Sequence, residues 1–294
     1  MRSCYAKFVG GICVSVFSLG LIVLPAAAQD DKGGASVGCA EMEEFMRSAK
    51  IGAMRNVPKG VTLPHRATLE DGKMKHDVFI QTIDEKKASF QSSRGTELNF
   101  RDFWGYNIAG YELAKVLGIN MVTPYVERKV GGKSASLSWA VDNMMMDEVE
   151  RMKKKETPPD LDSWNKEMYV IRVFNQLIAN TDDNLTNFLI TRDWHLWMID
   201  FTRAFRTQKN LLNQKNLVQV DRKVLEKIRH LDEQAGVLQE KTVKPHYLTK
   251  MELEAVLARA NKIAEFFDEE VKKKGEGAVL FDLPRSGQTC GAGL

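Results

Sequence analysis

The chain has little cysteine, little proline and almost no net charge. Its 294 residues include 4 cysteines, 8 prolines and 21 glycines, and the formal net charge is +3. The low proline and glycine contents exclude collagen-like and proline-rich classes, and a hydrophobic content of 44% excludes a disordered chain. Nucleic-acid binders usually carry a basic surplus, so we expect no nucleic-acid partner.

Several catalytic signatures are also missing. The sequence contains no cluster of Cys and His residues, no glycine-rich phosphate loop and no G-x-S-x-G nucleophile motif. After residue 28, no stretch is long and apolar enough to span a bilayer. The function therefore has to be sought in other residue patterns.

The first 28 residues have the pattern of a secretory signal peptide. Arg2 and Lys7 give a positive start, Phe8–Leu24 is mostly apolar and uncharged, and Ala26–Ala28 form a small-residue cleavage site. An uncleaved membrane anchor is the alternative, because the apolar stretch is near the lower length limit for a spanning helix. Cleavage predicts an exported protein, periplasmic or secreted, without a membrane span and with a net charge of +3 − 2 = +1.

Two cysteines would remain after cleavage, Cys39 and Cys290, near the two ends of the chain. Export permits oxidation, so a single disulfide between them is one expectation. Two free thiols on loose tails are the other.

The rest of the chain divides into a smaller β-rich part and a larger helical part. We expect a flexible leader over 29–38, an N-terminal lobe over 39–142, a C-terminal lobe over 143–285 and a tail over 286–294. Hydrophobic periodicity and turn residues predict helices over 40–54, 103–117, 169–179, 219–229 and 250–273, strands over 61–69, 78–83 and 89–91, a β-hairpin over 121–130 and 134–141, and a charged, solvated connection over 147–163.

The densest group of polar functional residues lies in residues 180–206. Two short strands, 188–191 and 196–199, form a predicted hairpin that follows a polar loop. Asp182, Asn187 and Asp200 should therefore lie at one end of this hairpin, with spacings of 187 − 182 = 5 and 200 − 187 = 13.

This set of side chains suits phosphoryl transfer. That chemistry needs metal ligands and a carboxylate that orients the attacking hydroxyl, and Asp and Asn oxygens are suitable ligands for Mg²⁺ or Mn²⁺. Asp182 would orient the nucleophile, whereas Asn187 and Asp200 would hold the metal. The alternative is a polar turn in which these side chains satisfy local backbone groups.

The stretch resembles the catalytic loop and metal-binding strand end of the protein-kinase-like superfamily. The nearest resemblance is to the atypical branch with phosphoinositide kinases, HipA-type kinases and the Golgi casein kinase family. Its loop, Asp-Arg-His-x-x-Asn, is matched by Asp182 and Asn187 but not by the Arg-His pair, and Ile-Asp-Phe-Gly appears as Ile199–Thr202, without Gly. The chain also resembles a group of exported bacterial proteins with the same loop.

The resemblance covers residues 60–285, of which 167–206 is the specific part, and it implies a two-lobed α+β kinase-like fold. It also implies a Lys and a Glu in the small lobe that hold the nucleotide phosphates. Gln81 stands at the Lys position and Asn107 at the Glu position, a neutral pair that could still hydrogen-bond. Lys86 or Lys87 could reach the phosphates instead, or lie in a solvated turn.

Two further features have two interpretations each. Trp139 falls in the segment 138–142, where the family's hinge meets adenine, so it is either a nucleotide contact or a packing residue. Arg203 and Arg206 follow the metal-binding Asp and could bind an anionic substrate or brace the loop against carboxylates.

The sequence thus predicts a protein that binds ATP together with Mg²⁺ or Mn²⁺. It would transfer phosphate to a hydroxyl of an unknown protein or small molecule, with attenuated activity. One alternative is a non-catalytic, pseudokinase-type binding module of the cell envelope, since ATP is scarce outside the cytoplasm. The other is AMP transfer onto protein.

Overall fold

The structure, a computed structural model, describes residues 37–57, 64–92, 95–182 and 184–284. These residues belong to one unit. The predicted signal peptide, residues 61–63 of a predicted strand, and Cys290 lie outside the described residues.

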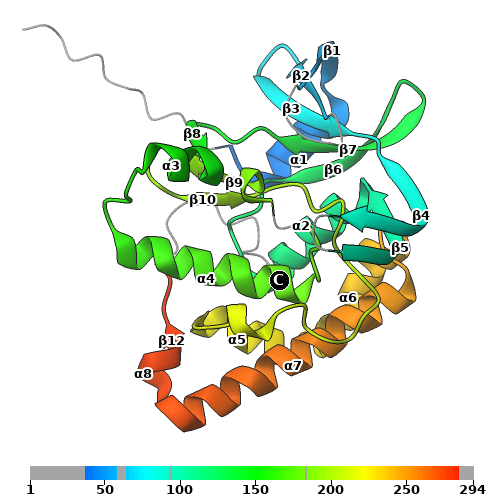
Figure 1. The fold of residues 1–294 in the computed structure, drawn as a ribbon. Helices are drawn as coiled ribbons and strands as arrows, with labels where there is room; N and C mark the ends of the chain where they lie inside the picture. Colours follow the sequence, from blue (N-terminus) through cyan, green and yellow to red (C-terminus); the bar gives the residue numbers. More distant parts are fainter. Residues whose placement is uncertain (1–36, 58–63, 93–94, 183, 285–294) are drawn as a thin grey trace, which may run out of the picture. The chain divides into compact units, whose positions relative to one another are not determined.

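A five-stranded antiparallel sheet forms the N-terminal part of the fold (Figure 1). The strand order is β1-β2-β3-β7-β6, with β1 (Lys50–Asn56), β2 (His65–Glu70), β3 (Lys75–Gln81), β6 (Tyr125–Val130) and β7 (Lys133–Trp139). The predicted β6–β7 hairpin is confirmed. Gly131 and Gly132 join its strands with φ of 57° and 82°, which side chains rarely adopt.

The first helix is shorter than predicted. Helix α1 (Cys39–Ser48) ends where Ala49 becomes extended, and the following residues form β1 rather than continuing to residue 54. Pairing with β2 supplies backbone hydrogen-bond partners that override the local helical spacing. Phe45 and Met46 of α1 pack into the small core of this sheet.

A separate two-stranded sheet follows β3, of which only residues 89–91 were predicted. Strands β4 (Asp84–Ser92) and β5 (Gly95–Phe103) form a hairpin whose rings Phe90 and Phe100 stack with centroids 4.3 Å apart. The hairpin carries the chain from β3 to the next helix.

Helix α2 (Gly105–Leu117) ends at Gly118 with φ of 67°, as predicted. Its apolar residues belong to the large core formed with the C-terminal helices, not to the small core of the sheet. Two hydrogen bonds also tie it there: Tyr106 donates to Glu252, and Lys227 donates to the carbonyl of Val116 at 3.1 Å. The predicted N-terminal lobe over 39–142 therefore shares α2 with the larger part of the fold.

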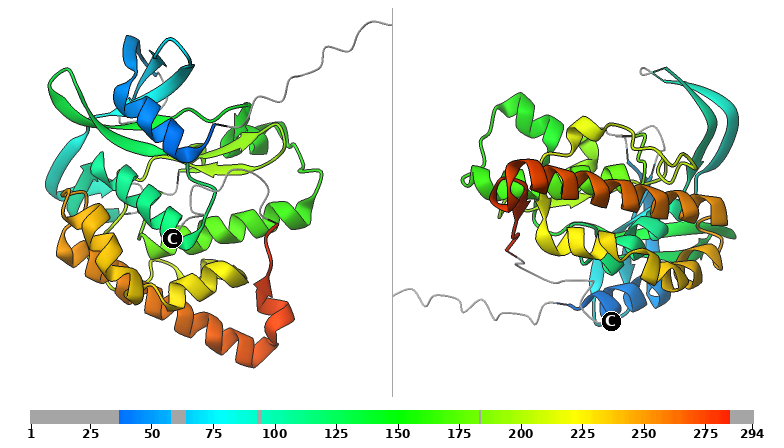
Figure 2. Two further views of the ribbon diagram at one scale, coloured as in Figure 1. Left: turned by 180° about the vertical axis from the view of Figure 1, so that it is seen from behind. Right: turned by 90° about the horizontal axis from the view of Figure 1, so that it is seen from below.

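The C-terminal part is mainly helical (Figures 1 and 2). Its elements are β8 (Met144–Asp147), α3 (Glu148–Lys154), α4 (Leu161–Leu177), β9 (Phe188–Thr191), β10 (Leu196–Met198), β11 (Val220–Asp221), α5 (Arg222–Arg229), α6 (Ala235–Leu238), α7 (Lys250–Lys274), α8 (Glu276–Val279) and β12 (Leu280–Phe281). Among the described residues, no helix combines the length and apolar character needed to cross a membrane.

The connection predicted over 147–163 is largely exposed, as expected, but it contains α3 and the start of α4. Asp147 caps α3 by accepting from the backbone of Glu150 at 2.8 Å, and Asp160 caps α4 in the same way. A carboxylate at the start of a helix accepts hydrogen bonds from backbone N–H groups that have no partner within the helix. A charged segment that contains prolines can therefore still hold the N-terminal ends of two helices.

Candidate functional site

The hairpin that carries the predicted metal ligands has the predicted geometry. Strands β9 and β10 pair antiparallel with Met198 opposite Phe188, and the backbone N–H of Ile199 donates to the carbonyl of Asn187 at 3.1 Å. Asn187 precedes β9 and Asp200 follows β10, so both residues lie at the same end of the hairpin.

Asp200 is held by hydrogen bonds in an unusual backbone conformation. Its φ is 59°, in the left-handed region, and its N–H donates to the Tyr125 hydroxyl at 3.4 Å. The Thr202 hydroxyl donates to Asp200 Oδ1 at 2.8 Å. Burial raises the pKa of Asp200, and the nearby Asp182 carboxylate raises it further. The structure thus brings two predicted functional carboxylates into electrostatic contact.

The loop before β9 is shaped by its own polar side chains. The backbone N–H of Asp182 donates to Asn180 Oδ1 at 3.0 Å, and Asn184 Oδ1 accepts from Thr186 N–H at 3.1 Å. The short 3₁₀ helix Leu185–Asn187 then leads into β9, and Asn187 Nδ2 is buried without a hydrogen-bond partner among the described residues. The side chains of Asn180 and Asn184 therefore satisfy local backbone N–H groups, as the polar-turn interpretation predicted. These bonds do not use the Asp182 carboxylate or the Asn187 side-chain amide, so both groups could still bind a ligand.

The structure brings Gln81 and Asn107 together. Gln81 ends β3 and Asn107 lies in α2, and Asn107 Nδ2 donates to Gln81 Oε1 and, at 3.1 Å, to Ser136 Oγ. Asn107 Oδ1 accepts the backbone N–H of Phe201 at 2.7 Å. Gln81 also lies close enough to the Asp200 carboxylate to lower the pKa of Asp200 against the effect of burial. Neutral hydrogen bonds therefore link Gln81 through Asn107 to the backbone of Phe201, the residue after Asp200.

Gly110 explains how closely α2 approaches this segment. A Cβ atom at Gly110 would lie 2.8 Å from Cδ2 of the Phe201 ring, a distance that would force the ring to move. The glycine therefore lets α2 pack directly against the residue that follows Asp200.

Two residues predicted to contact a nucleotide also have partners within the protein. Trp139 is 5% exposed in the small core, stacks on His76 at 3.6 Å and donates to Asp142 at 3.1 Å, which favours the packing alternative. Lys87 lies on β4, not in a turn, and pairs with Glu85 at 3.0 Å. Its ammonium also lies 5.4 Å from the centre of the Phe90 ring.

Arg203 and Arg206 brace the site. Arg203 contacts Glu97 of β5 at 3.4 Å, and Arg206 pairs with the same carboxylate. Arg206 also donates to the Thr181 hydroxyl at 3.2 Å, next to Asp182. The sequence analysis did not single out Glu97, because no local pattern links β5 to residues more than 80 positions away.

A third carboxylate, Asp102, was also missed. It lies near the end of β5 and is 6% exposed, and its pKa is raised to about 6, chiefly by burial. The carboxylates of Asp200 and Asp182 contribute to this rise, so all three acids are within electrostatic reach of one another. Strand β5 was not predicted from the sequence, so no pattern indicated that Asp102 would lie near Asp182 and Asp200.

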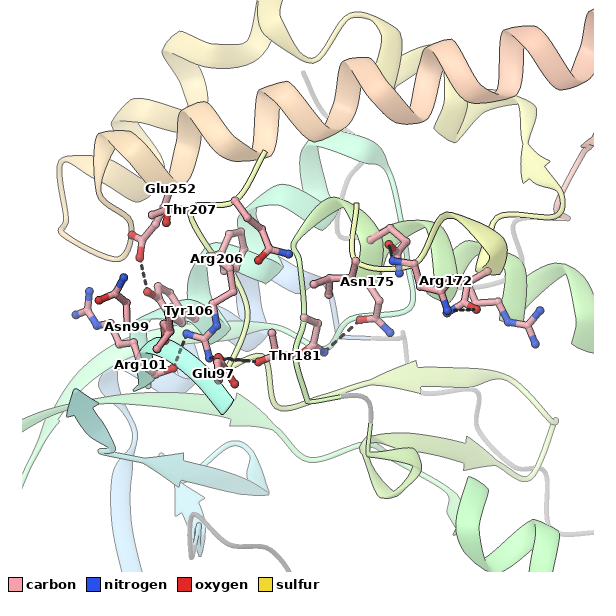
Figure 3. Close-up of a pocket in the computed structure, with 18 of the residues that line it drawn as sticks. Glu97, Asn99, Arg101, Tyr106, Arg172, Asn175, Thr181, Arg206, Thr207 and Glu252 are labelled. Atoms are coloured by element: carbon pink, nitrogen blue, oxygen red, sulfur yellow. Dashed lines mark hydrogen bonds and ion pairs between the residues drawn. The ribbon is translucent and has the colours of Figure 1, made fainter. Parts of the chain in front are cut away.

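A large pocket lined by polar and apolar side chains adjoins the loop that carries Asp182 (Figure 3). Its volume is about 1360 Å³, and its lining combines α4, β5 and the segment after Phe205. Glu97, Arg101, Thr181 and Arg206 face one another on one side of it, joined by ion pairs and hydrogen bonds. The pocket is large enough to hold a small molecule beside the loop that carries Asp182.

The residues present fit a hard divalent cation. Asn187 and Asp200 offer oxygen ligands, and the buried Asp102 Oδ1 has no hydrogen-bond donor among the described residues. No three His, Cys, Asp or Glu side chains in the described ranges converge as a complete ligand set. A cation here would therefore keep part of its coordination for water and for ligand oxygens, as Mg²⁺ commonly does.

Comparisons with known proteins agree with this geometry at the level of the fold. No protein-family model and no curated protein matches the chain. The solved structure of a hydra Fam20 protein with sugar is similar, with a TM-score of 0.58 and 14% identity, over 85% of this chain and 94% of that chain. The Golgi casein kinase is similar with a TM-score of 0.56 and 13% identity, over 85% of this chain and 80% of that chain.

The chain therefore has an atypical protein-kinase-like α+β fold, with a sheet-rich N-terminal part and a helical C-terminal part. This confirms the fold class predicted from the sequence. The resemblance to a group of exported bacterial proteins remains a prediction.

Proposed function

We propose that this protein is a kinase-like phosphotransferase that binds ATP with Mg²⁺ or Mn²⁺ and turns over slowly. The observation that carries the proposal is the arrangement of Asn187 and Asp200 at one end of the β9–β10 hairpin, with the Asp182 carboxylate close to Asp200. The kinase-like fold supports the same activity.

Each polar residue has a distinct role in the proposed reaction. Asp182 would accept a hydrogen bond from the acceptor hydroxyl and orient it toward the γ-phosphate. Asn187 and Asp200 would hold the cation, which when bound neutralises charge on the phosphate oxygens. The acceptor, a protein or a small molecule, would enter from the pocket beside Thr181.

The neutral Gln81–Asn107 pair explains why we expect slow turnover. Charge-assisted hydrogen bonds are roughly twice as strong as neutral ones, and Gln81 provides no positive charge opposite the phosphates. Loss of an electrostatic contact of this kind costs on the order of 100- to 1000-fold in rate. The same observation favours a second candidate function, a non-catalytic nucleotide-binding module of the cell envelope.

Nucleotide binding tested by calorimetry, with and without Mn²⁺, separates the roles of the carboxylates. We expect Asp200→Ala to abolish Mn²⁺-dependent ATP binding, because Asp200 supplies the charged ligand. Asp182→Ala should leave binding largely intact but remove any phosphotransfer. Asn187→Ala should weaken binding less than Asp200→Ala does.

Asp193→Asn is a matched control, because Asp193 lies at the opposite turn of the same hairpin and hydrogen-bonds to Thr191. Equal losses of binding in Asp182→Ala and Asp200→Ala would contradict these roles. Measurable ATP binding without any phosphotransfer or hydrolysis would support the binding-module alternative.

A further inference from the structure

The buried carboxylate of Asp102 is only partly compensated by its surroundings. The residue is 6% exposed, and its Oδ1 atom has no hydrogen-bond donor among the described residues. Leaving a buried acceptor unpaired is destabilising, and more so when the group is charged. An unpaired, buried carboxylate oxygen therefore indicates a missing cation or a missing donor.

Asp102 is joined to the metal-binding segment through Thr202. The backbone N–H of Phe103 donates to the Thr202 carbonyl at 2.9 Å, which fixes the end of β5 beside this residue. Thr202 is 2% exposed, and its hydroxyl, which lies close enough to Asp102 to influence the pKa of that carboxyl, donates to Asp200 Oδ1 at 2.8 Å. Thr202 stands where the related kinase motif has Gly, so this link depends on a side chain that the motif lacks.

The charges around Asp102 favour a cation. Asp182 and Asp200 repel its charged form, while Arg203 attracts it. Arg203 and the neighbouring Arg206 share Glu97 as an ion-pair partner. Gln81, which stands at the expected Lys position, is neutral. The negative charges of Asp102, Asp182 and Asp200 therefore exceed the positive charge that the neighbouring arginines can offer them.

We propose that Asp102 is a third carboxylate of the cation site, acting through Thr202 on Asp200 and through water bound to the cation. The inference rests on the proposed function, because it assumes that Asn187 and Asp200 hold a divalent cation. In the described ranges no three His, Cys, Asp or Glu side chains converge as a ligand set, so the proposal gives Asp102 a supporting role rather than that of a direct ligand. Outer groups of this kind orient the ligands and accept hydrogen bonds from coordinated water.

The test is Mn²⁺ affinity of the purified protein, measured with MnCl₂ by electron paramagnetic resonance and without nucleotide. Loss of a supporting group around a metal typically costs on the order of 10- to 100-fold in affinity, so we expect a loss of this size in Asp102→Asn. Thr202→Val should lose affinity in the same direction, whereas Thr202→Ser should retain it, because Ser keeps the hydroxyl. Asp193→Asn should bind Mn²⁺ as the unaltered protein does.

The outcomes distinguish this inference from the proposed function. If Asp200→Ala abolishes Mn²⁺ binding while Asp102→Asn and Thr202→Val leave it unchanged, Asp102 has no part in the site and the proposed function stands. If the unaltered protein does not bind Mn²⁺ without nucleotide, this inference is overturned, whereas the proposed function is decided separately by Mn²⁺-dependent ATP binding. Equal losses in Thr202→Val and Thr202→Ser would show that packing, rather than the hydroxyl, is responsible, and would also overturn the link through Thr202.

Discussion

At the scale of single residues, the position of Gln81 changes what its replacement should do. From the sequence, Gln81→Lys alone would bury an unpaired ammonium beside Asn107, which is destabilising. The Gln81 side chain lies close enough to the Asp200 carboxylate to lower its pKa, so a lysine ammonium at this position would face a negative charge. We therefore expect the single variant to fold, but to compete with the cation for Asp200.

The double variant Gln81→Lys with Asn107→Glu should recover a charged pair. The carboxylate introduced at position 107 would draw the ammonium away from Asp200, because the side chains of Gln81 and Asn107 already contact each other in the native pair. We expect the double variant to bind ATP and Mn²⁺ more tightly than either single variant and to gain phosphotransfer or ATP hydrolysis. Calorimetry on the unaltered protein, the two single variants and the double variant gives the coupling free energy between positions 81 and 107 for ATP binding. Additive effects of the two substitutions would contradict the pairing of these residues.

At the scale of elements, the β9–β10 hairpin is anchored to α4 by a partly buried ion pair. His195 Nδ1 contacts Glu167 Oε1 at 2.8 Å, and the second oxygen of Glu167 accepts the backbone N–H of Leu196 at 2.7 Å. Burial alone would lower the pKa of His195, but the Glu167 carboxylate outweighs burial and the pKa is raised. This anchor supports the hairpin that carries Asn187 and Asp200.

The raised pKa of His195 makes its contribution to stability depend on pH. Because the folded state holds the proton more tightly, the stabilisation is fully present below the unfolded pKa of about 6.5 and is lost as pH rises through the folded value. His195→Gln should therefore destabilise more at about pH 5.5 than at about pH 8.5. Urea unfolding at both pH values measures this. His230→Gln is the control, because His230 is exposed and its ion pairs are screened; an equal His195→Gln effect at the two pH values would contradict the ion-pair assignment.

At the scale of the whole molecule, helix α1 has a disulfide bond at Cys39 and hydrogen bonds to α2. Cys39 begins α1 and is disulfide-bonded. The Glu43 carboxylate of the same helix accepts from the Tyr111 hydroxyl at 2.8 Å and from Lys115 at 3.2 Å, so α1 contacts α2. Cys290, its predicted partner, lies outside the described residues, and the pairing stays a prediction.

We expect titration of the mature protein in denaturant without reductant to find no free thiol. A bridge from Cys39 to Cys290 would close a loop of 290 − 39 = 251 residues. The chain-entropy model gives about 5 kcal/mol of stabilisation as an upper figure for such a loop. Reduction should therefore lower the unfolding midpoint, with Cys290→Ser reproducing the effect. Two reactive thiols in the oxidised protein would reject the bridge.

Some features followed from the sequence because their causes are local. The β9–β10 hairpin, the end of α2 at Gly118 and the β6–β7 turn at Gly131–Gly132 depend on neighbouring residues and on glycine's access to positive φ. The placement of Asn187 and Asp200 at one hairpin end follows from that register. The sequence by itself thus determined the hairpin that carries the candidate metal ligands, and the fold class followed from the resemblance of its motifs to those of kinase-like proteins.

Only the tertiary structure decided which distant residues complete the site. Asp102 enters it because β5 lies beside the segment after Asp200, and Glu97 because the same strand reaches Arg203 and Arg206. These contacts join positions about 100 residues apart, where neither periodicity nor spacing carries a signal. Burial then determined their chemistry, since removal from water is what raises the pKa of Asp102 and leaves its carboxylate short of a partner.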